Sequence, residues 1–268
     1  MPQSDWIGIN RDARGVVCVT IANAAKLNTL NRAVMTALID AVEALGTAPT
    51  LRVVILRGAG ERAFIGGADI TEMATLDTSS ARAFITLVHQ SCDVFRRLKV
   101  PVIARIQGYA LGAGLEVAAA CDMRIAASDA QFGMPEVRIG VPSVVEAALL
   151  PQLIGWGRTR ELLLTAQTID AAKAERWGLV EEVVAPDALD AAVERRVAAI
   201  LECGPRAVAA QKALIQAWEN LPMQAAIQRG IDTFAASWDS DEPARMMGGF
   251  LDAMHRRKLG QTNGGNNA

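Results

Sequence analysis

Two glutamates and a run of glycines are the parts of this sequence whose types and spacing suit acid–base catalysis. Glu116 follows the glycine-dense stretch GYALGAG (residues 108–114) and lies in the apolar segment LEVAAAC. A helix that begins after glycines presents backbone N–H groups, which stabilise an anion or a developing oxyanion. Because a charged carboxylate among apolar side chains is costly, we expect Glu116 to be partly desolvated and to serve chemistry. The alternative is an exposed glutamate in a first helical turn, where the helix dipole favours it.

Glu136 is the second candidate acid and follows a proline in the segment QFGMPEVRIG, 20 residues after Glu116. A helix over residues 114–121 covers about 12 Å at ~1.5 Å per residue. A strand over residues 123–127 returns about 16 Å at ~3.3 Å per residue. The loop that carries Glu136 can therefore lie beside the start of that helix, and two carboxylates near free N–H groups would form an acid–base site with an anion hole. An ordinary solvated loop glutamate is the alternative.

A third glycine-containing segment, AFIGGADITEM (residues 63–73), follows the apolar run VVILR (residues 53–57). Paired glycines followed by Ala68 and Asp69 indicate a turn from a strand into a helix, with backbone N–H groups open to a ligand. An ordinary glycine-rich turn in which Asp69 caps a helix is the alternative.

The stretch GYALGAG also resembles the nucleotide-binding pattern of short-chain dehydrogenases. That pattern requires a position near the first strand and a later Tyr-x-x-x-Lys pair, whereas this stretch lies in the middle of the chain. The single tyrosine, Tyr109, has Ala113 four residues later. The dehydrogenase hypothesis therefore fails, and a structural turn of small residues remains open for this stretch.

These segments require a scaffold of alternating strands and helices. Short apolar runs predict strands over Val16–Ile21, Val53–Arg57, Pro101–Gln107, Met123–Ala127 and Val180–Val184. Helical spacing of apolar residues predicts helices over Asn31–Leu45 and Ser79–Leu98. Such alternation is typical of an α/β domain. From Asp187 onward the pattern is helical, so we expect an α/β core over residues 1–200, a helical segment over 201–260 and a flexible tail over 261–268.

Composition narrows the classes of function. The chain has 268 residues and a formal net charge of -2, so it lacks the basic field that nucleic-acid binding needs. The uncharged stretches are too short to span a bilayer. Four scattered cysteines and two histidines form no disulfide or metal-binding pattern. With no apolar leader at its N-terminus, the sequence predicts a cytoplasmic protein without a metal site.

Together and in this order, these segments resemble the enoyl-CoA hydratase/isomerase (crotonase) family, and the resemblance covers nearly the whole chain. The matching segments are NAAKLNTLN (23–31), AFIGGADITEM (63–73), PVIARIQGYALGAGLEVAAACD (101–122), AQFGMPEVRIG (130–140) and IGWGRTRELLLTAQTIDAAKAERWGLVEEVV (154–184). The resemblance implies a spiral of ββα units with a helical C-terminal segment. It further implies assembly into homotrimers or homohexamers through that segment.

The resemblance also implies a role for each matching residue. Ala68 and Ala113 would supply the two amides of the oxyanion hole, and Glu116 and Glu136 would be the catalytic glutamates. Contacts to the substrate or its coenzyme A moiety are implied for Lys26, Leu27, Gly67, Asp69, Ile70 and Gly112, and for Phe250 and Lys258 at a neighbouring subunit's site.

The implied substrate is an acyl-CoA thioester, and no separate cofactor is expected because coenzyme A is part of that substrate. Two glutamates favour hydration of a 2-enoyl-CoA, whereas isomerases of the family usually use one carboxylate. Isomerase, dehydratase, hydrolase or lyase chemistry on an acyl-CoA is the alternative, and a non-catalytic RNA-binding or assembly relative is a remote one.

The chain departs from the family after Glu136. Typical hydratases continue with a glycine-rich PGAGG-like turn, whereas this chain reads GVPSVVEAALLP (residues 140–151). Glycines would let the backbone of this turn come close to the site, whereas the bulkier Ser143, Val144 and Val145 would keep it farther away. The spacing of Ser143 and Glu146 predicts a capping box at the start of the next helix.

Overall fold

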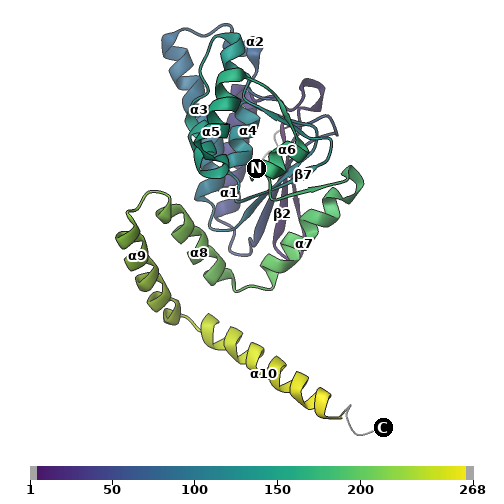
Figure 1. The fold of residues 1–268 in the computed structure, drawn as a ribbon, viewed down its shortest axis with the longest axis vertical. Coiled ribbons are helices and arrows are strands. Elements are labelled where there is room, and N and C mark those ends of the chain that lie inside the picture. Colours follow the sequence, from purple (N-terminus) through teal and green to yellow (C-terminus); the bar gives the residue numbers. More distant parts are fainter. Residues whose placement is uncertain (1–4, 264–268) are drawn as a thin grey trace. The chain divides into compact units, whose positions relative to one another are not determined.

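The structure is a computed structural model that describes residues 5–263, with side chains as far as Arg256. The chain divides into two compact units, Met1–Ile200 and Leu201–Ala268. Each unit is described by itself below (Figure 1). No helix in the described part of the chain is long and apolar enough to cross a membrane.

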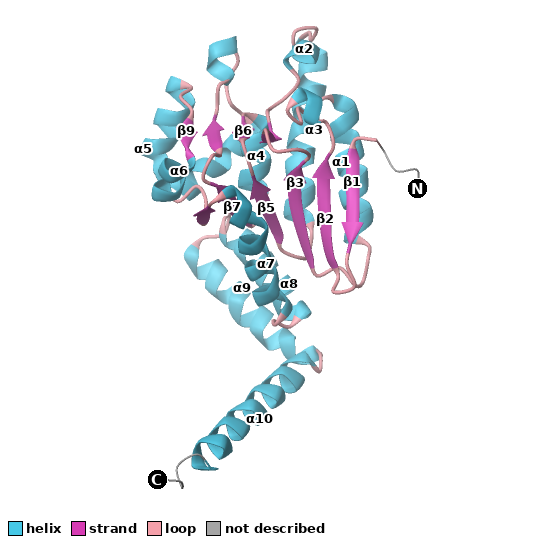
Figure 2. Ribbon diagram, turned by 90° about the vertical axis from the view of Figure 1, so that its right-hand side faces the viewer, coloured by secondary structure: helices cyan, strands magenta, loops and turns pink. Residues whose placement is uncertain are grey.

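A six-stranded sheet forms the centre of the first unit (Figure 2). Its strands, in spatial order, are β1 (Ile7–Arg11), β2 (Val16–Ile21), β3 (Val53–Gly58), β5 (Val102–Ile106), β7 (Met123–Ala127) and β10 (Glu182–Val184). β1 pairs antiparallel with β2, and every other pair in this sheet is parallel. The predicted strands are all present, because β-branched runs buried on both faces are typical of central parallel strands.

A smaller sheet lies beside the first and contains β4 (Ala63–Ile65), β6 (Tyr109–Leu111), β8 (Gln131–Gly133) and β9 (Ile169–Asp170). The chain alternates between the sheets: β3 leads to β4, β5 to β6, and β7 to β8, and each pair is followed by helical structure. This is the spiral of ββα units that the family resemblance implies. It brings the segments after β4, β6 and β8 to one edge, because these three strands are parallel neighbours.

Helices pack around the two sheets. In the first unit they are η1 (Ala24–Lys26), α1 (Arg32–Gly46), α2 (Ile70–Met73), α3 (Thr78–Arg97), α4 (Ala113–Ala120), η2 (Glu136–Ile139), η3 (Val145–Leu149), α5 (Leu150–Thr165), α6 (Ala171–Trp177), η4 (Pro186–Ala188) and α7 (Leu189–Leu201). The side chain of Asn31 accepts a hydrogen bond from the amide of Val34 and starts α1. α1 packs on α3, and α3 on α4, so the small residues of α4 lie wholly buried.

The second unit is helical, as the pattern after Asp187 predicts. It contains α8 (Pro205–Trp218), α9 (Met223–Ala236), η5 (Ser237–Asp239) and α10 (Glu242–Asn263). The buried carboxylate of Glu242 accepts hydrogen bonds from the amides of Arg206 and Ala207 and thereby joins α10 to the start of α8. α10 continues to Asn263, past the expected start of the tail at residue 261. Residues 264–268 lie outside the described part.

Candidate active site

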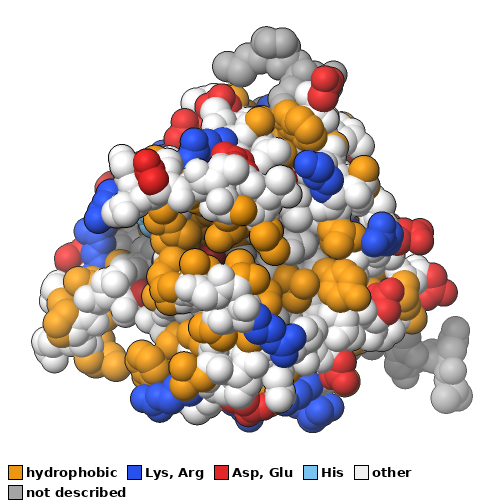
Figure 3. All heavy atoms as spheres, turned by 90° about the horizontal axis from the view of Figure 1, so that it is seen from above, with side chains coloured by type: hydrophobic (Ala, Val, Ile, Leu, Met, Phe, Trp, Pro, Cys, Tyr) orange, Lys and Arg blue, Asp and Glu red, His pale blue; other side chains and the backbone are white. Residues whose placement is uncertain are grey.

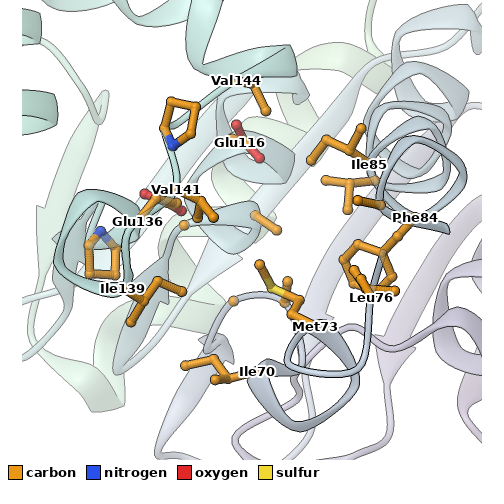
Figure 4. A pocket seen from close by; sticks show the side chains of 18 of the residues that line it. Ile70, Met73, Leu76, Phe84, Ile85, Glu116, Glu136, Ile139, Val141 and Val144 are labelled. Atoms are coloured by element: carbon orange, nitrogen blue, oxygen red, sulfur yellow. The ribbon is translucent and has the colours of Figure 1, made fainter. Parts of the chain in front are cut away.

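A cavity of about 580 Å³ opens at the edge of the small sheet. Its wall combines the glycine segment after β4, the start of α4, the region after β8, and the face of α3 that carries Phe84, Ile85 and Val88. Hydrophobic side chains gather around a hollow on this face of the molecule (Figure 3). In the close-up, Glu116 and Glu136 lie on one side of the cavity and the apolar side chains of α2 and α3 lie across from them (Figure 4).

Glu116 is in the first turn of α4 and is only 4% exposed. Its Oε1 accepts a hydrogen bond of 3.2 Å from the amide of Ala147. Burial raises the pKa of Glu116, and the nearby Glu136 carboxylate raises it further, to about 8. Glu116 is therefore desolvated, as expected, and carries its proton at neutral pH.

Glu136 begins η2 and is half-buried. The hydroxyl of Ser143 donates a hydrogen bond of 2.7 Å to its Oε2. The amide of Gly112 donates to the carbonyl of Gly133 at 2.9 Å, which ties the end of β8 to the start of α4. A Cβ at Gly112 would lie 2.3 Å from Oε1 of Glu136, and Gly112 has a φ of 51°. Only glycine lets the carboxylate lie this close to the start of α4.

Two backbone amides, those of Ala68 and Ala113, belong to residues that line the same cavity. Ala113 is the first residue of α4, where an amide has no partner within the helix. Ala68 follows Gly67, whose φ of 115° turns the chain between β4 and α2. Within the described residues, neither amide donates to a protein acceptor. Both N–H groups are therefore available to an oxygen atom in the cavity.

The N-terminal loop lies against the segment that carries Ala68. The amide of Gly66 donates to the carbonyl of Leu27, and the ammonium of Lys26 lies 3.6 Å from the carboxylate of Asp69. Asp69 also accepts hydrogen bonds from the first amides of α2, so it does cap that helix. Among the residues that the structure describes, Gly67, Ile70 and Gly112 line the cavity, whereas Lys26, Leu27 and Asp69 lie outside its lining.

The two residues expected near the C-terminus belong to α10 in the second unit. Phe250 is exposed on that helix. The side chain of Lys258 lies outside the described residues.

The prediction of a capping box at residues 143–146 is wrong. Val144 precedes η3 and no side chain caps it. Ser143 instead contacts Glu136, and Glu146 is buried with its Oε1 2.7 Å from Nδ1 of His89. The local pattern fits a capping box, but both side chains find partners outside it: Ser143 bonds Glu136, 7 residues earlier, and Glu146 bonds His89, 57 residues earlier.

The sequence analysis also missed the apolar wall opposite the acids, formed by Met73, Leu76, Phe84, Ile85 and Val88. Phe84 and Val88 are four residues apart and lie on the buried face of α3. That spacing is the ordinary pattern of a core-facing helix, so it contains no signal that separates a cavity wall from the core.

Comparison with known proteins agrees with this geometry. The family described as Enoyl-CoA hydratase/isomerase matches residues 11–256. A protein named crotonyl-CoA hydratase from Syntrophomonas wolfei is 36% identical over 84% of this chain and 87% of its own length. A short-chain-enoyl-CoA hydratase from Clostridium acetobutylicum is 35% identical over 91% of this chain and 93% of its own.

Solved structures agree with the same fold. The crystal structure of an enoyl-CoA hydratase from Bacillus anthracis superposes with a TM-score of 0.89 at 30% identity, covering 92% of this chain and 96% of that one. An enoyl-CoA hydratase from Mycobacterium smegmatis gives a TM-score of 0.90 at 30% identity, covering 93% and 97%. The match extends over almost the whole chain in both sequence and fold, and this protein therefore belongs to the enoyl-CoA hydratase/isomerase family.

Proposed function

We propose that this protein is an enzyme that hydrates a 2-enoyl-CoA thioester reversibly to a 3-hydroxyacyl-CoA. The observation that carries the proposal is that two neighbouring carboxyl groups, Glu116 and Glu136, line one cavity together with the unpaired amides of Ala68 and Ala113. The names of the two hydratase relatives support this reaction. Coenzyme A enters as part of the substrate, and the mechanism needs no separate cofactor.

In this mechanism the thioester carbonyl lies between the amides of Ala68 and Ala113, which stabilise the enolate that forms when water adds to the double bond. Glu116 and Glu136 hold the water between them. One carboxylate accepts a proton as the water oxygen bonds to the β-carbon, and the other carboxyl group donates a proton to the α-carbon. The pair thus ends the cycle with the number of protons that it had at the start.

The direct test is incubation of the protein with crotonyl-CoA and a panel of longer and branched 2-enoyl-CoAs, following the loss of absorbance of the conjugated thioester. We expect loss of absorbance and formation of the 3-hydroxyacyl-CoA. A control panel of 3-enoyl-CoAs detects the alternative reaction, because an isomerase would create the conjugated thioester and its absorbance. No reaction with either panel would contradict the proposal.

The pH dependence of kcat/KM follows from the raised pKa of Glu116. The two glutamates need one carboxyl proton to donate to the α-carbon of the substrate, and Glu116 loses its proton as the pH rises through about 8. We expect kcat/KM to fall about tenfold per pH unit above that value. Stopped-flow rates between pH 6 and pH 10 measure it, and a rate that stays constant across this range would contradict the assignment of the proton to Glu116.

We also propose that the second unit assembles the chain into a homotrimer or homohexamer. A surface cavity of about 710 Å³ in this unit is lined by apolar residues and one glycine: Trp218, Leu221, Met223, Ala226, Ile227, Gly230, Ile231 and Phe234. Large exposed apolar surfaces of this kind are typical of interfaces between proteins. In the assembly, Phe250 and Lys258 would reach the coenzyme A site of a neighbouring subunit.

Removal of residues 201–268 is expected to give inactive monomers or aggregates, because the apolar contacts between subunits are lost. Light scattering after size-exclusion chromatography measures the mass of the full-length and shortened proteins. A fully active, monodisperse monomer after truncation would show that the helical unit has no role in assembly. We propose a cytoplasmic location, which is supported by four cysteines, Cys18, Cys92, Cys121 and Cys203, that form no disulfide in the described part of the chain.

A further inference from the structure

The segment Ser143–Ala147 contacts both acids of the site. At one end, the hydroxyl of Ser143 donates to Glu136, and at the other end the amide of Ala147 donates to Glu116. The distances are 2.7 Å and 3.2 Å. A change in the path of this segment therefore moves a hydrogen-bond donor away from each acid.

The backbone of this segment is strained at Val145. Its φ is 40°, a conformation that β-branched residues rarely adopt. Strain of this kind persists only where the surrounding contacts hold the chain in place. Glycine at this position would adopt the same φ without strain.

Glu146 supplies the contact that holds the segment. It is 7% exposed, and its Oε1 lies 2.7 Å from Nδ1 of His89 on α3. Its Oε2 is buried and, within the described residues, accepts no hydrogen bond from an N–H or O–H group, although the weakly donating thiol of Cys92 lies close to the carboxylate. A buried carboxylate oxygen without a partner is costly, so its presence here calls for a role that offsets this cost.

We propose that Glu146 is a positioning residue for the acid pair. Held by His89, it fixes the strained segment Ser143–Ala147 so that the segment hydrogen-bonds Glu136 at one end and Glu116 at the other. The proposal rests on the proposed hydration for its kinetic consequence, but not for its structural one.

The charge of Glu146 has a second effect on Glu116. The groups near Glu146 are His89 and Cys92 on α3 and Glu116 on α4, and Glu136 on η2 acts on the same Glu116 carboxyl group. After burial and the Glu136 carboxylate, the Glu146 charge is a further influence that raises the pKa of Glu116. Burial, together with the charges of Glu146 and Glu116, also raises the pKa of the Cys92 thiol, so this thiol stays neutral. Removal of the Glu146 charge therefore lowers the pKa of Glu116.

Three variants test the proposal. Glu146→Ala removes both the contact with His89 and the charge. Glu146→Gln keeps a side chain that can hydrogen-bond His89 but removes the charge. The double variant Val145→Gly/Glu146→Ala also removes the backbone strain at residue 145, so the segment no longer needs Glu146 to keep its conformation. Gln90→Ala, at an exposed neighbour of His89 on α3, is the control.

For Glu146→Ala we expect kcat for crotonyl-CoA hydration to fall by about 10- to 100-fold with little change in KM, because the acids are displaced. Glu146→Gln should keep kcat within about threefold at its own pH optimum. The double variant should recover at least about tenfold over Glu146→Ala, because glycine adopts the required φ without a clamp. Gln90→Ala should match the wild-type protein.

A second measurement needs no substrate. The infrared carboxyl stretch of Glu116, identified by its absence in Glu116→Gln, is titrated against pH in the wild-type protein and in Glu146→Gln. We expect the titration midpoint to move to lower pH in Glu146→Gln. If no enoyl-CoA is hydrated, the proposed function fails, while this titration still tests the electrostatic influence of Glu146 on Glu116.

The proposal is overturned if Glu146→Ala has wild-type kcat, or if the double variant Val145→Gly/Glu146→Ala has no higher kcat than Glu146→Ala. An unchanged titration of Glu116 in Glu146→Gln also overturns it. If Glu146→Ala does not fold, Glu146→Gln decides the question. The expected result is a pH profile shifted to lower pH with kcat at its optimum within about threefold of wild type, and a larger fall in kcat with an unshifted pH profile overturns the proposal.

Discussion

Glu116→Gln and Glu136→Gln are each expected to lower kcat for hydration by about 10²–10⁴-fold. Each substitution keeps the shape of the side chain and removes its ability to transfer a proton. Because the two acids work as a unit, the double variant should fall much less than the product of the two single losses. Initial rates with crotonyl-CoA at saturating concentration measure this loss, and binding of the saturated butyryl-CoA should survive in all three variants.

Glu175→Gln is the matched control, because Glu175 is an exposed glutamate whose side chain accepts a hydrogen bond from the amide of Val183, away from the cavity. It should retain wild-type kcat. If Glu136→Gln keeps nearly full activity while Glu116→Gln is inactive, the two-acid mechanism is wrong and a one-acid, isomerase-like reaction is the better interpretation.

Stability distinguishes lost chemistry from lost structure in Glu116→Gln. The pKa of Glu116 rises from 4.5 to about 8 on folding, so between these values the folded protein binds the proton more tightly than the unfolded chain. The free energy of unfolding therefore falls as the pH rises from 4.5 to 8. Glutamine does not ionise, so the Glu116→Gln variant avoids this loss in the free energy of unfolding, which is on the order of 3 kcal/mol at pH 7. Urea unfolding at pH 5 and pH 7 should show a stabilised variant whose advantage grows with pH.

Ala113→Pro is expected to lower kcat by about 10²–10³-fold, because it removes one donor of the proposed oxyanion hole. Proline suits the first position of a helix, and Ala113 is the first residue of α4, so the helix itself can form. The loss should appear with every enoyl-CoA of the panel, since each thioester carbonyl would use the same amide. Rates at saturating substrate, together with circular dichroism of the variant, provide the measurement.

Ala113→Ser is the control for this substitution, because serine keeps the backbone N–H and adds only a hydroxyl. It should stay within about tenfold of the wild-type rate. A folded Ala113→Pro protein with wild-type kcat would show that the carbonyl oxygen does not use this amide.

The sequence predicts the large sheet well and the small sheet poorly. β2 and β7 lie at the predicted residues, because each is a short and mainly apolar run in a buried parallel sheet. β4, β6 and β8 have three residues each, too few for an alternating pattern to show. β1 was also missed: its exposed outer half mixes polar with apolar residues.

The functional site, like the fold, is predictable from the sequence only in part. Glu116 stands out in the sequence because a carboxylate in an apolar helix must serve some purpose, and the structure shows it buried. The partners of Ser143 and Glu146 were unpredictable, since His89 lies 57 residues before Glu146 and the contact depends on how α3 packs against η3. Local spacing describes hydrogen bonds within one turn and carries no information about such tertiary contacts.

The spiral of ββα units has a consequence for how the site is assembled and varied. Each turn contributes to the common edge: the amide of Ala68 follows β4, the amide of Ala113 and the carboxyl group of Glu116 follow β6, and Glu136 follows β8. During synthesis the two amides and Glu116 leave the ribosome before Glu136, so the acid pair is completed last. The same separation lets evolution alter the segment after β8 while the amides remain in place. One oxyanion-binding scaffold can in this way acquire different proton-transfer chemistry through changes in a single turn of the spiral.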